Sequence, residues 1–311
     1  MTDAASDAVA RARQRVTSAL DAWVTRPPGT PDIARIGLGF TNYNWRIVWP
    51  DGTTHFAKSP GEETHGLIER AAAVDASRKA GEAGVAPRLL QVDPASGVEI
   101  YEFLDGYRSA AITDFLDPVL LERALTGYRL VHGSANFLTT ATGFQQIEAH
   151  LEHLRRLNIA APVEFTRLAS AVVAAEAAIT AAGMDLAGCY NDAHITNYMI
   201  GPENQVKIID WEYASNNDPV WDLGLVAFES FMSSERERLL VELYYGSWRR
   251  EIGARLYLYS QLSMIKWALW ALLQSHLSSM PYDFRQYAQF LLMRAENGIK
   301  HPRWHEALRE L

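Results

Sequence analysis

The spacing of apolar residues divides the chain into an N-terminal part with short strands and a longer, mainly helical part. Ala, Val and Leu recur at helical spacing over residues 4–24, so we expect an amphipathic helix that ends before the Pro-Pro-Gly of residues 27–29. Over residues 33–57 the pattern changes to short β-rich runs, and the Asp-Gly pair at residues 51–52 is a hairpin signal. This region predicts a small antiparallel sheet.

The remaining pattern predicts two lobes. A helix over residues 64–84 and two strand-like runs, PRLLQV and GVEIYEF, complete a first lobe at residues 1–104. The second lobe, residues 105–311, has one short β-rich segment at 187–213. Its helical patterns cover residues 118–132, 143–157, 164–182, 235–277 and 283–296. The chain is therefore predicted to have an α+β fold, with a small lobe of antiparallel sheet plus helix and a larger helical lobe.

Composition narrows the class of protein. With 311 residues, 48% of them hydrophobic, the chain can bury a sizeable core. Its formal net charge of −8 argues against nucleic acid as a partner, because proteins that bind a phosphate backbone concentrate Lys and Arg. We see no signal peptide and no uninterrupted apolar run that spans a bilayer, so we expect a cytoplasmic protein without a membrane partner. The single Cys189 is expected to be a small buried hydrophobe.

A glycine-containing segment between two predicted strands is the first candidate for chemistry. Gly37, Gly39, Thr41 and Asn42 lie in GLGFTN, where glycines let backbone N–H groups approach a phosphate closely. The motif alone is weak, since a glycine-bearing hairpin turn is commoner than a phosphate loop. Lys58 lies at the end of the next strand, from which a lysine can reach phosphates as a point charge, although most lysines are merely solvated.

Two acidic residues and an asparagine form a stronger candidate. Asp192 and Asn197 lie in CYNDAHITN, and the β-rich run VKIID that follows ends at Asp210. Phosphoryl transfer needs one carboxylate that orients the attacking hydroxyl, with an amide oxygen and a second carboxylate that hold the magnesium ion bridging the nucleotide phosphates. Each acid by itself would be explained by a turn or a helix cap. Both in this order, with the intervening asparagine and the upstream glycines, favour a kinase.

These segments resemble the choline and ethanolamine kinases, relatives of the aminoglycoside phosphotransferases that share the protein-kinase fold. The resemblance covers nearly the whole chain: GLGFTNYNWRI is similar to the nucleotide loop, CYNDAHITN to the catalytic loop, and IDWEYASNNDPVWDLG is the most specific match. It implies a bilobal protein-kinase-like fold and the cofactors ATP and Mg²⁺. It also implies residue roles: Asp192 as catalytic base, Asn197 and Asp210 as magnesium ligands, Lys58 on the phosphates, and the backbone around Glu102 and Leu104 as the adenine site.

Aromatic residues near the C-terminus are candidates for the acceptor site. Trp267 and Trp270 lie three apart in a helical run and therefore share a face, and Tyr287 is on a following helix. Three rings can hold a quaternary ammonium, although an aromatic stripe in a helical core is the commoner explanation. In choline kinases the matching W-x-x-W helix and the tyrosine after it line the choline pocket, and the glutamate that matches Glu229 supplies a nearby negative charge. The resemblance therefore favours choline.

Two positions depart from the family pattern. Tyr190 stands where the family commonly has His before the catalytic Asn-Asp pair, so the support of the catalytic loop must differ. An alignment without gaps over residues 68–87 places Ala73 where the family has the glutamate that pairs with the phosphate-binding side chain. Glu69, one helical turn earlier on the same face, is our hypothesis for a substitute.

The sequence leaves the acceptor open. We expect an enzyme that phosphorylates the hydroxyl of choline or a close amino alcohol, a small cationic alcohol, and gives a phosphocholine-type product and ADP. Ethanolamine, another amino alcohol, an amino sugar or a natural-product intermediate are alternative acceptors. A pseudokinase, suggested by Ala73, is less favoured because Asp192, Asn197 and Asp210 are all present. The oligomeric state also stays open, with a homodimer as one possibility.

Overall fold

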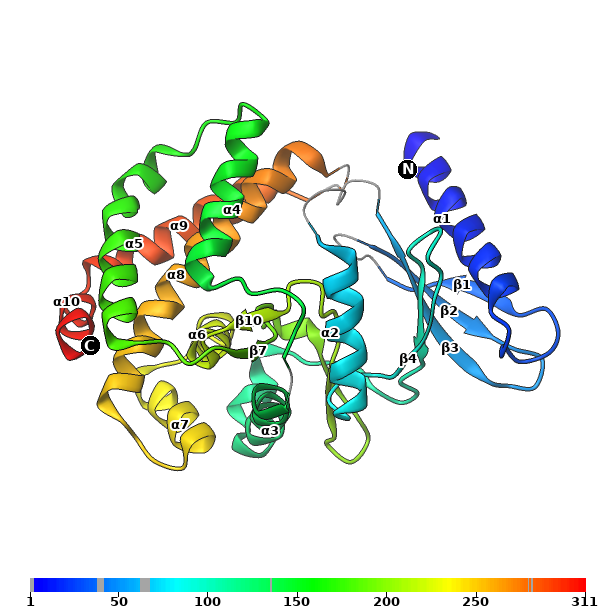
Figure 1. The fold of residues 1–311 in the computed structure, drawn as a ribbon, viewed down its shortest axis with the longest axis horizontal. Coiled ribbons are helices and arrows are strands. Elements are labelled where there is room, and N and C mark those ends of the chain that lie inside the picture. Colours follow the sequence, from blue (N-terminus) through cyan, green and yellow to red (C-terminus); the bar gives the residue numbers. More distant parts are fainter. Residues whose placement is uncertain (1–2, 38–41, 62–67, 135, 279, 281) are drawn as a thin grey trace.

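The structure is a computed structural model that describes residues 3–37, 42–61, 68–134, 136–278, 280 and 282–311. Two of the predicted nucleotide-binding residues, Gly39 and Thr41, lie outside these ranges. Figure 1 shows the described chain as a small β-rich part beside a larger helical part.

An antiparallel sheet forms the centre of the N-terminal part. Its strands run in the order β1 (Asp32–Arg35), β2 (Asn42–Val48), β3 (Thr54–Pro60), β5 (Glu99–Glu102) and β4 (Leu89–Val92). A tight turn at the predicted Asp-Gly pair joins β2 and β3, where Gly52 has a φ of 87° and its N–H donates to the Trp49 carbonyl at 2.9 Å. The predicted antiparallel sheet is confirmed.

Two helices flank this sheet (Figure 1). α1 (Asp3–Ala22) packs Val16 and Leu20 into one buried cluster with Trp45 and Ile47 of β2. α2 (Arg70–Glu82) lies on the side of the sheet that faces the helical part. The amphipathic helix predicted at the N-terminus is therefore present, because its apolar stripe covers one face of the sheet.

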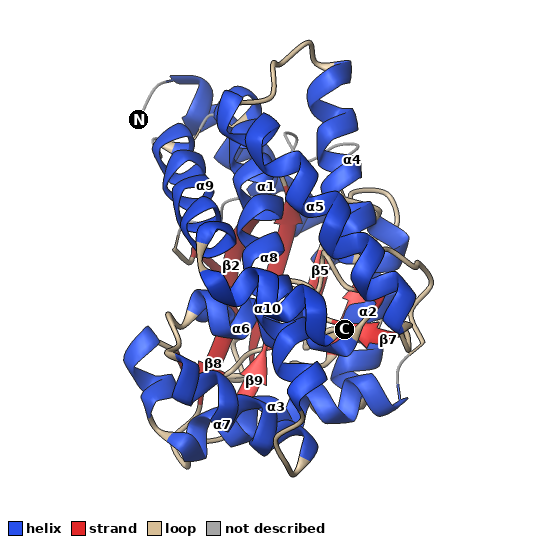
Figure 2. Cartoon of the chain, turned by 90° about the vertical axis from the view of Figure 1, so that its left-hand side faces the viewer, coloured by secondary structure: helices blue, strands red, loops and turns tan. Residues whose placement is uncertain are grey.

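Helices dominate the chain beyond the sheet, with only short strands among them (Figure 2). The helices are α3 (Pro118–Ser134), α4 (Gly143–Arg156), α5 (Val163–Ala182), α6 (Pro219–Glu229), α7 (Ser234–Tyr245), α8 (Arg250–Leu277), α9 (Phe284–Lys300) and α10 (Pro302–Glu310), with 3-10 turns η2 (Ile112–Leu116) and η3 (Ile195–Asn197). The strands are β6 (Arg108–Ser109), β7 (Ala187–Cys189), β8 (Tyr198–Ile200), β9 (Val206–Ile208) and β10 (Ser215–Asn217). The predicted α+β class is confirmed, and the boundary between residues 104 and 105 stays a prediction.

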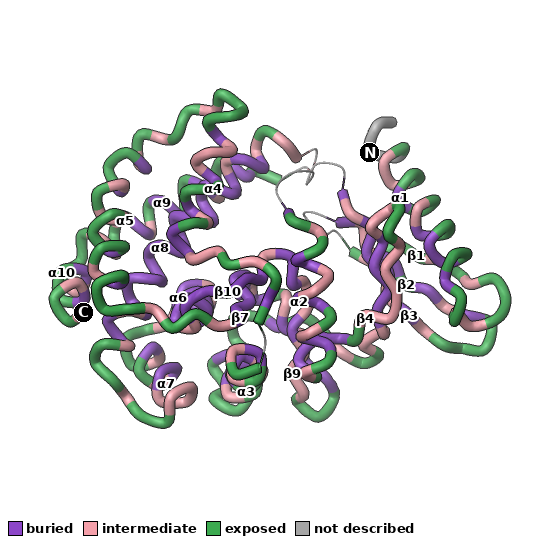
Figure 3. Tube along the Cα trace, in the orientation of Figure 1, coloured by how far each residue is buried: buried purple, intermediate pink, exposed green. Residues whose placement is uncertain are grey.

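α8 is the central helix of this part. It packs against α9, α6, α4 and α10, and most of its residues are buried (Figure 3). A helix that is covered on all sides is apolar all round rather than along one stripe. This packing explains why the acceptor candidates Trp267 and Trp270 are each only 8% exposed.

Parts of the helical prediction need correction. The helix predicted over residues 235–277 is two helices, because Gly246 ends α7 in a left-handed conformation with a φ of 80°, and its N–H donates to Glu242 at 2.8 Å. α6 was not predicted as a helix, since PVWDLGLVAFE is buried almost throughout and therefore has no polar stripe. The nine-residue α10 was also missed.

α5 is the one described helix that is long and apolar enough to cross a membrane. It has 20 residues and a mean hydropathy of 1.3 over its most apolar 18-residue window, 22% of which is buried. It was not predicted as a span, because charged residues interrupt its apolar pattern. One such helix is weak evidence for a membrane span, because helices that pack inside a fold pass the same test, and α5 contacts α8, α9 and α10.

Candidate active site

A strained turn presents Asp192. This residue is buried in the loop between β7 and η3, and Asn191 before it has a φ of 63°, which is costly for a residue other than glycine. The Asn191 amide nitrogen donates to the Tyr213 carbonyl at 3.0 Å and to Ser215 Oγ at 2.8 Å. Its Oδ1 accepts from Asn217 Nδ2 at 2.8 Å. These bonds hold the turn, so Asp192 has a fixed position.

A buried carboxylate of α6 supports the same loop. Asp222 is 0% exposed and accepts from the backbone N–H groups of Tyr190 and Asn191, each at 2.7 Å. His132 Nε2 of α3 lies 2.9 Å from Asp222 Oδ2, and its Nδ1 lies 2.6 Å from the Tyr244 hydroxyl. Neither Asp222 nor His132 was predicted from the sequence. An acid in the midst of the apolar run PVWDLGLVAF was the available signal, since a buried carboxylate needs donors.

The loop that ends in Asp210 meets the catalytic loop. The Ile209 N–H donates to the Asn197 carbonyl at 3.0 Å, and Asn197 Nδ2 donates to Asp192 Oδ2 at 3.2 Å. The Tyr190 hydroxyl donates to the Ile209 carbonyl at 2.6 Å. Tyr190, the first departure from the family pattern, therefore joins the catalytic loop to the residue before Asp210. The structure brings the three residues predicted for phosphoryl transfer together.

Lys58 of β3 contacts Asp210 and a second carboxylate, that of Glu212. Its Nζ is 3.0 Å from Asp210 Oδ1 and 3.0 Å from Glu212 Oε1. Glu212 also accepts from Arg70 at 2.9 Å and from Asn42 Nδ2 at 2.9 Å. The sequence analysis missed Glu212 and Arg70, although Glu212 stands two residues after Asp210 in the segment that matched the family best.

The hypothesis that Glu69 replaces the missing helix glutamate does not hold. The Glu69 carboxylate is the N-cap of α2 and accepts from the Ala72 N–H at 2.6 Å. Ala73 is buried within α2. The carboxylate that meets Lys58 besides Asp210 is that of Glu212, which reaches the ammonium from the loop after β9 rather than from α2.

The charges around Asp210 fit a divalent cation. Burial acts to lower the pKa of Lys58, but Asp210 and Glu212 outweigh it and raise that pKa well above its ordinary value. Burial raises the pKa of Asp210, and although Lys58 opposes this, the nearby Glu212 adds to it. An added positive charge would favour the ionised form of Asp210. Because carboxylate and amide oxygens are the donors that Mg²⁺ prefers, Asp210 and Asn197 fit this ion.

The other predicted nucleotide residues that the structure describes lie at or shortly after the ends of β1 and β5. Gly37 follows β1 and has a φ of 54°, a conformation that favours glycine. Glu102 ends β5, and its N–H donates to the Arg88 carbonyl at 3.1 Å. The Leu104 carbonyl accepts from Tyr107 N–H at 3.3 Å. Adenine binding by the backbone around Glu102 and Leu104 stays a prediction.

Aromatic rings of α8 meet a tyrosine from the Asp210 loop. The ring centroids of Trp267 and Trp270 are 5.5 Å apart and the rings are nearly perpendicular, at 79°. The Tyr213 ring lies 5.3 Å from that of Trp267, and its hydroxyl accepts from Trp270 Nε1 at 2.7 Å. Tyr213 was not predicted. Since it follows Asp210 by three residues, it connects the aromatic rings to the phosphate-side loop.

Glu229 and Tyr287 are electrostatic neighbours of Asp192. Burial raises the pKa of Glu229 to about 7; His194 opposes this and the Asp192 carboxylate adds to it. Burial also raises the pKa of Tyr287, and the carboxylates of Glu229 and Asp192 raise it further. The structure thus places two of the residues predicted to bind a cation, Glu229 and Tyr287, within the electrostatic reach of the predicted base.

A buried lysine that the sequence analysis missed also faces Asp192. Lys266 is 0% exposed, and its Nζ donates to the Asn191 carbonyl at 3.4 Å. Burial raises the pKa of Asp192 to about 7, and Lys266 opposes this. Burial lowers the pKa of Lys266 to about 7, and Asp192 opposes this. Each group therefore stabilises the charged form of the other.

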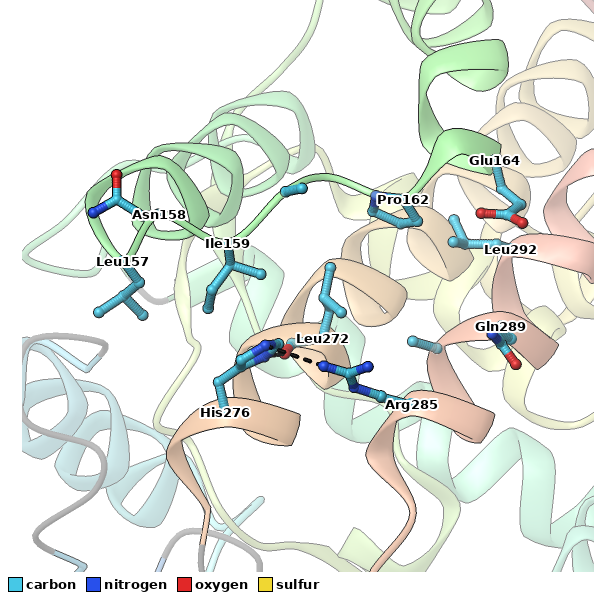
Figure 4. Close-up of a pocket in the computed structure, with 12 residues that line it drawn as sticks. Leu157, Asn158, Ile159, Pro162, Glu164, Leu272, His276, Arg285, Gln289 and Leu292 are labelled. Carbon is cyan, nitrogen blue, oxygen red and sulfur yellow. Dashed lines mark hydrogen bonds between the residues drawn. The ribbon is translucent and has the colours of Figure 1, made fainter.

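A hollow of about 470 Å³ lies elsewhere, between the α4–α5 connection and the helices α8 and α9. His276 Nε2 of α8 and Arg285 of α9 lie 3.3 Å apart in it, and Ile159 and Leu292 are among the apolar residues that line it (Figure 4). The predicted site residues do not line this hollow, so it is separate from the candidate active site.

The fold and sequence have known relatives. A choline/ethanolamine kinase family protein from Mesorhizobium loti has a TM-score of 0.82 and 28% identity, covering 96% of this chain and 98% of that one. The structure of LicA in complex with AMP has a TM-score of 0.75 and 20% identity, covering 92% and 97%. Probable choline kinase 1 from Arabidopsis thaliana is 25% identical over 162 residues, which are 42% of this chain and 47%, about half, of the plant protein. The predicted resemblance is confirmed, and since the phosphotransferase enzyme family (APH) matches over residues 32–254, the chain belongs to that family.

Proposed function

We propose that this phosphotransferase transfers the γ-phosphoryl group of ATP to the hydroxyl of choline or a closely related amino alcohol. One observation carries the proposal: the buried Asp192 has two different kinds of neighbour. One kind is Asn197, which donates to it, and Asp210, which pairs with Lys58; these groups suit nucleotide phosphates. The other kind is the carboxylate of Glu229, which together with the aromatic rings of α8 suits a cation.

Asp192 handles the proton of the acceptor. The hydroxyl oxygen forms a bond to the γ-phosphorus while the bond from that phosphorus to the β–γ bridging oxygen breaks, and ADP leaves. Asp192 orients the hydroxyl and accepts its proton. A carboxylate whose pKa is raised to about 7 is a better proton acceptor at neutral pH than an ordinary aspartate. Asn197, at 3.2 Å, holds the carboxylate in its orientation.

The groups around Lys58 and Asp210 bind the nucleotide. Lys58 supplies a positive charge for phosphate oxygens, and its own position is set by Asp210 and Glu212 at 3.0 Å each. Asn197 and Asp210 would hold Mg²⁺, which when bound neutralises charge on the phosphates. The proposal keeps the sequence prediction that the segment from Gly37 to Asn42 covers the phosphates, including its Gly39 and Thr41.

Glu229 and the aromatic rings bind the positive end of the acceptor. A cation over an aromatic face gains about 0.5–2 kcal/mol. This binding positions the hydroxyl at Asp192 rather than activating it. A quaternary ammonium fits better than a primary one, because a primary ammonium brings three donors that need acceptors. We place the reaction in the cytoplasm, where ATP is available.

ADP release by the purified protein tests the proposal. The assay supplies Mg-ATP with choline, ethanolamine, related amino alcohols or an aminoglycoside. Asp192→Asn is expected to lower choline-dependent turnover by about 10²–10⁴-fold, since general base catalysis is lost. Asp185→Asn is the matched control, because Asp185 is an exposed aspartate before β7.

Each outcome of this assay is decisive for one part of the proposal. Turnover with choline that Asp192→Asn abolishes and Asp185→Asn leaves intact supports both the base and the acceptor. Turnover only with ethanolamine or an aminoglycoside keeps the kinase and overturns choline. ATP binding without turnover on any acceptor overturns the enzyme and favours a pseudokinase.

A further inference from the structure

One of the aromatic rings predicted to bind a cation, that of Trp267, already contacts an amino group of the chain, that of Lys266. Lys266 Nζ lies 3.3 Å from the ring centroid of Trp267 and 4.7 Å from that of Tyr213. It donates to the Asn191 carbonyl at 3.4 Å, and the side chain is fully buried. Fully buried lysines are rare unless partnered, and aromatic faces supply part of the compensation that water would give. One face of Trp267 is therefore occupied before any acceptor binds.

Asp192 and Glu229 differ in the positive groups that oppose their charges. The charges that act on Lys266 are those of Asp192 and Asp222. The charges that act on Glu229 are those of His194, Asp192 and Arg294. Asp192 is thus the neighbour that Lys266 and Glu229 share. Its negative charge is opposed by Lys266, whose Nζ contacts the carbonyl of the preceding residue, Asn191, at 3.4 Å, whereas the charge of Glu229 is opposed by His194 and Arg294.

This asymmetry matters for an acceptor that has a cation at one end and a hydroxyl at the other. Two carboxylates in one pocket offer the cation two places to bind. If the cation bound at Asp192, the hydroxyl would point away from the γ-phosphate and the complex would be unproductive. A positive charge close to Asp192 repels the cation from that place, and at pocket distances this repulsion changes affinity by roughly tenfold or more.

We propose that Lys266 sets the orientation of the acceptor: its ammonium group, held on Trp267 and Tyr213 beside Asp192, keeps the positive end of the acceptor away from the catalytic carboxylate and leaves Glu229 as the anion to which that end binds. This inference rests on the proposed function, because it concerns the acceptor of the same site. Lys266 is a positioning residue that acts through Asp192 and through the acceptor's charge.

Steady-state kinetics of Lys266→Met with choline give the first test. Unproductive binding lowers kcat and KM by the same factor, so we expect both to fall about tenfold while kcat/KM changes less than about threefold. The neutral isostere 3,3-dimethylbutan-1-ol has no charge to misplace, so its kinetic constants should not show this joint fall. A lower kcat for choline with an unchanged or higher KM would mean a purely structural role and would overturn the inference.

Equilibrium binding of tetramethylammonium gives a second test that needs no turnover. Calorimetry is expected to show about tenfold tighter binding to Lys266→Met than to the parent, because the cation gains access to Asp192. The double variant Lys266→Met with Asp192→Asn should lose this gain. Unchanged or weaker binding to Lys266→Met would contradict the inference.

Two further variants separate charge from packing. Lys266→Gln keeps a donor for the Asn191 carbonyl but removes the charge, so it should behave like Lys266→Met. Parent-like behaviour of Lys266→Gln would assign Lys266 to loop anchoring alone and overturn the inference. Lys300→Met, at an exposed lysine near the end of α9, is the matched control, and melting temperatures report whether each variant folds.

Different results would overturn the proposed function and the proposed role of Lys266. If the parent does not phosphorylate choline but tetramethylammonium binds more tightly to Lys266→Met, the proposed function falls and the cation-excluding role of Lys266 stands. If the parent phosphorylates choline but neither test responds to Lys266→Met, the function stands and this inference falls. If the parent does not phosphorylate choline and neither the parent nor Lys266→Met binds tetramethylammonium, both fall.

Discussion

The phosphate side and the acceptor side of the site hold their charges in different ways. On the phosphate side, opposite charges are in direct contact, with Lys58 at 3.0 Å from both Asp210 and Glu212. Burial acts to raise the pKa of Glu212, but Lys58 and Arg70 outweigh it and lower that pKa. Because the pKa of Lys58 is raised well above its ordinary value and that of Glu212 is lowered, Lys58 and Glu212 keep their charges throughout the neutral range.

On the acceptor side, burial rather than direct ion pairing governs the charges. Burial moves the pKa values of Asp192, Lys266 and Glu229 to about 7, and the lysine is held on aromatic rings. A small change of pH, or the substitution of one neighbouring residue, therefore changes the net charge of the acceptor side. The comparison teaches that direct pairing fixes the phosphate-binding side, while the acceptor side depends on a balance of burial and charge.

The largest effect is expected when the pairing on the phosphate side is broken. Lys58→Met leaves the Glu212 carboxylate, whose side chain is 1% exposed, with less positive charge around it. We expect the free energy of unfolding to fall by about 3 kcal/mol, because removing one partner of a buried ion pair leaves an uncompensated charge. The kcat/KM for ATP should also fall by about 10²–10³-fold through lost stabilisation of the phosphates. Urea unfolding and ADP-release kinetics measure the two effects.

A matched lysine on the surface controls for this change. Lys207 is half-buried, donates to the Gly84 carbonyl at 2.6 Å and forms no ion pair with a carboxylate among the described residues, so Lys207→Met should lower stability by less than about 1 kcal/mol. If Lys58→Met lowered stability no more than Lys207→Met, the phosphate side would not depend on its direct ion pairs, and the contrast with the acceptor side would disappear.

A smaller effect is expected from pH on the acceptor side. Below pH 7, Glu229 is protonated and neutral, and above pH 7 it is an anion that attracts a cation. Choline has a fixed charge, so its KM should fall about tenfold from pH 6 to pH 8 as the ionised fraction of Glu229 rises. The groups that act on Glu229 are Asp192, His194 and Arg294, and Tyr287 lies near it.

Kinetics of Glu229→Gln over the same pH range isolate this group. The variant should have a high KM for choline that falls less than the parent's from pH 6 to pH 8, because of the three acceptor-side groups with a pKa of about 7 only Lys266 and Asp192 then remain. Its kcat should still rise through pH 7, because Asp192 must lose its proton to act as a base. A KM that still fell tenfold in Glu229→Gln would show that another group governs binding of the cation.

The sequence predicted most of the fold because local patterns there agree with the final structure. The sheet of the N-terminal part has β-rich runs and a hairpin signal, and α1, α3, α4, α5 and α9 have helical periodicity. α6 escaped prediction because burial on all sides removes the polar stripe by which a helix is recognised. The break at Gly246 was missed because a single left-handed glycine leaves the apolar pattern on either side intact.

Only some residues of the candidate site were predicted from the sequence. Asp192, Asn197 and Asp210 were predicted because they lie on adjoining segments with a recognisable spacing. Asp222 and Lys266 were not, because each is a single charge in an otherwise apolar stretch of helix and the helical pattern does not show that it contacts the catalytic loop. Their roles are set by tertiary contacts with the catalytic loop, which the sequence does not display.

The smallest effect is expected at Glu69, the residue that the sequence suggested as a partner of Lys58. Its carboxylate caps α2, so Glu69→Ala should lower the free energy of unfolding by about 1 kcal/mol. Nucleotide affinity, measured by calorimetry, should stay within about twofold, because Glu212 rather than Glu69 contacts the Lys58 ammonium. Glu69→Asp, which restores a good N-cap, should recover the lost stability. A large loss of ATP affinity in Glu69→Ala that Glu69→Asp does not restore would instead return Glu69 to the phosphate side, as the sequence hypothesis had it.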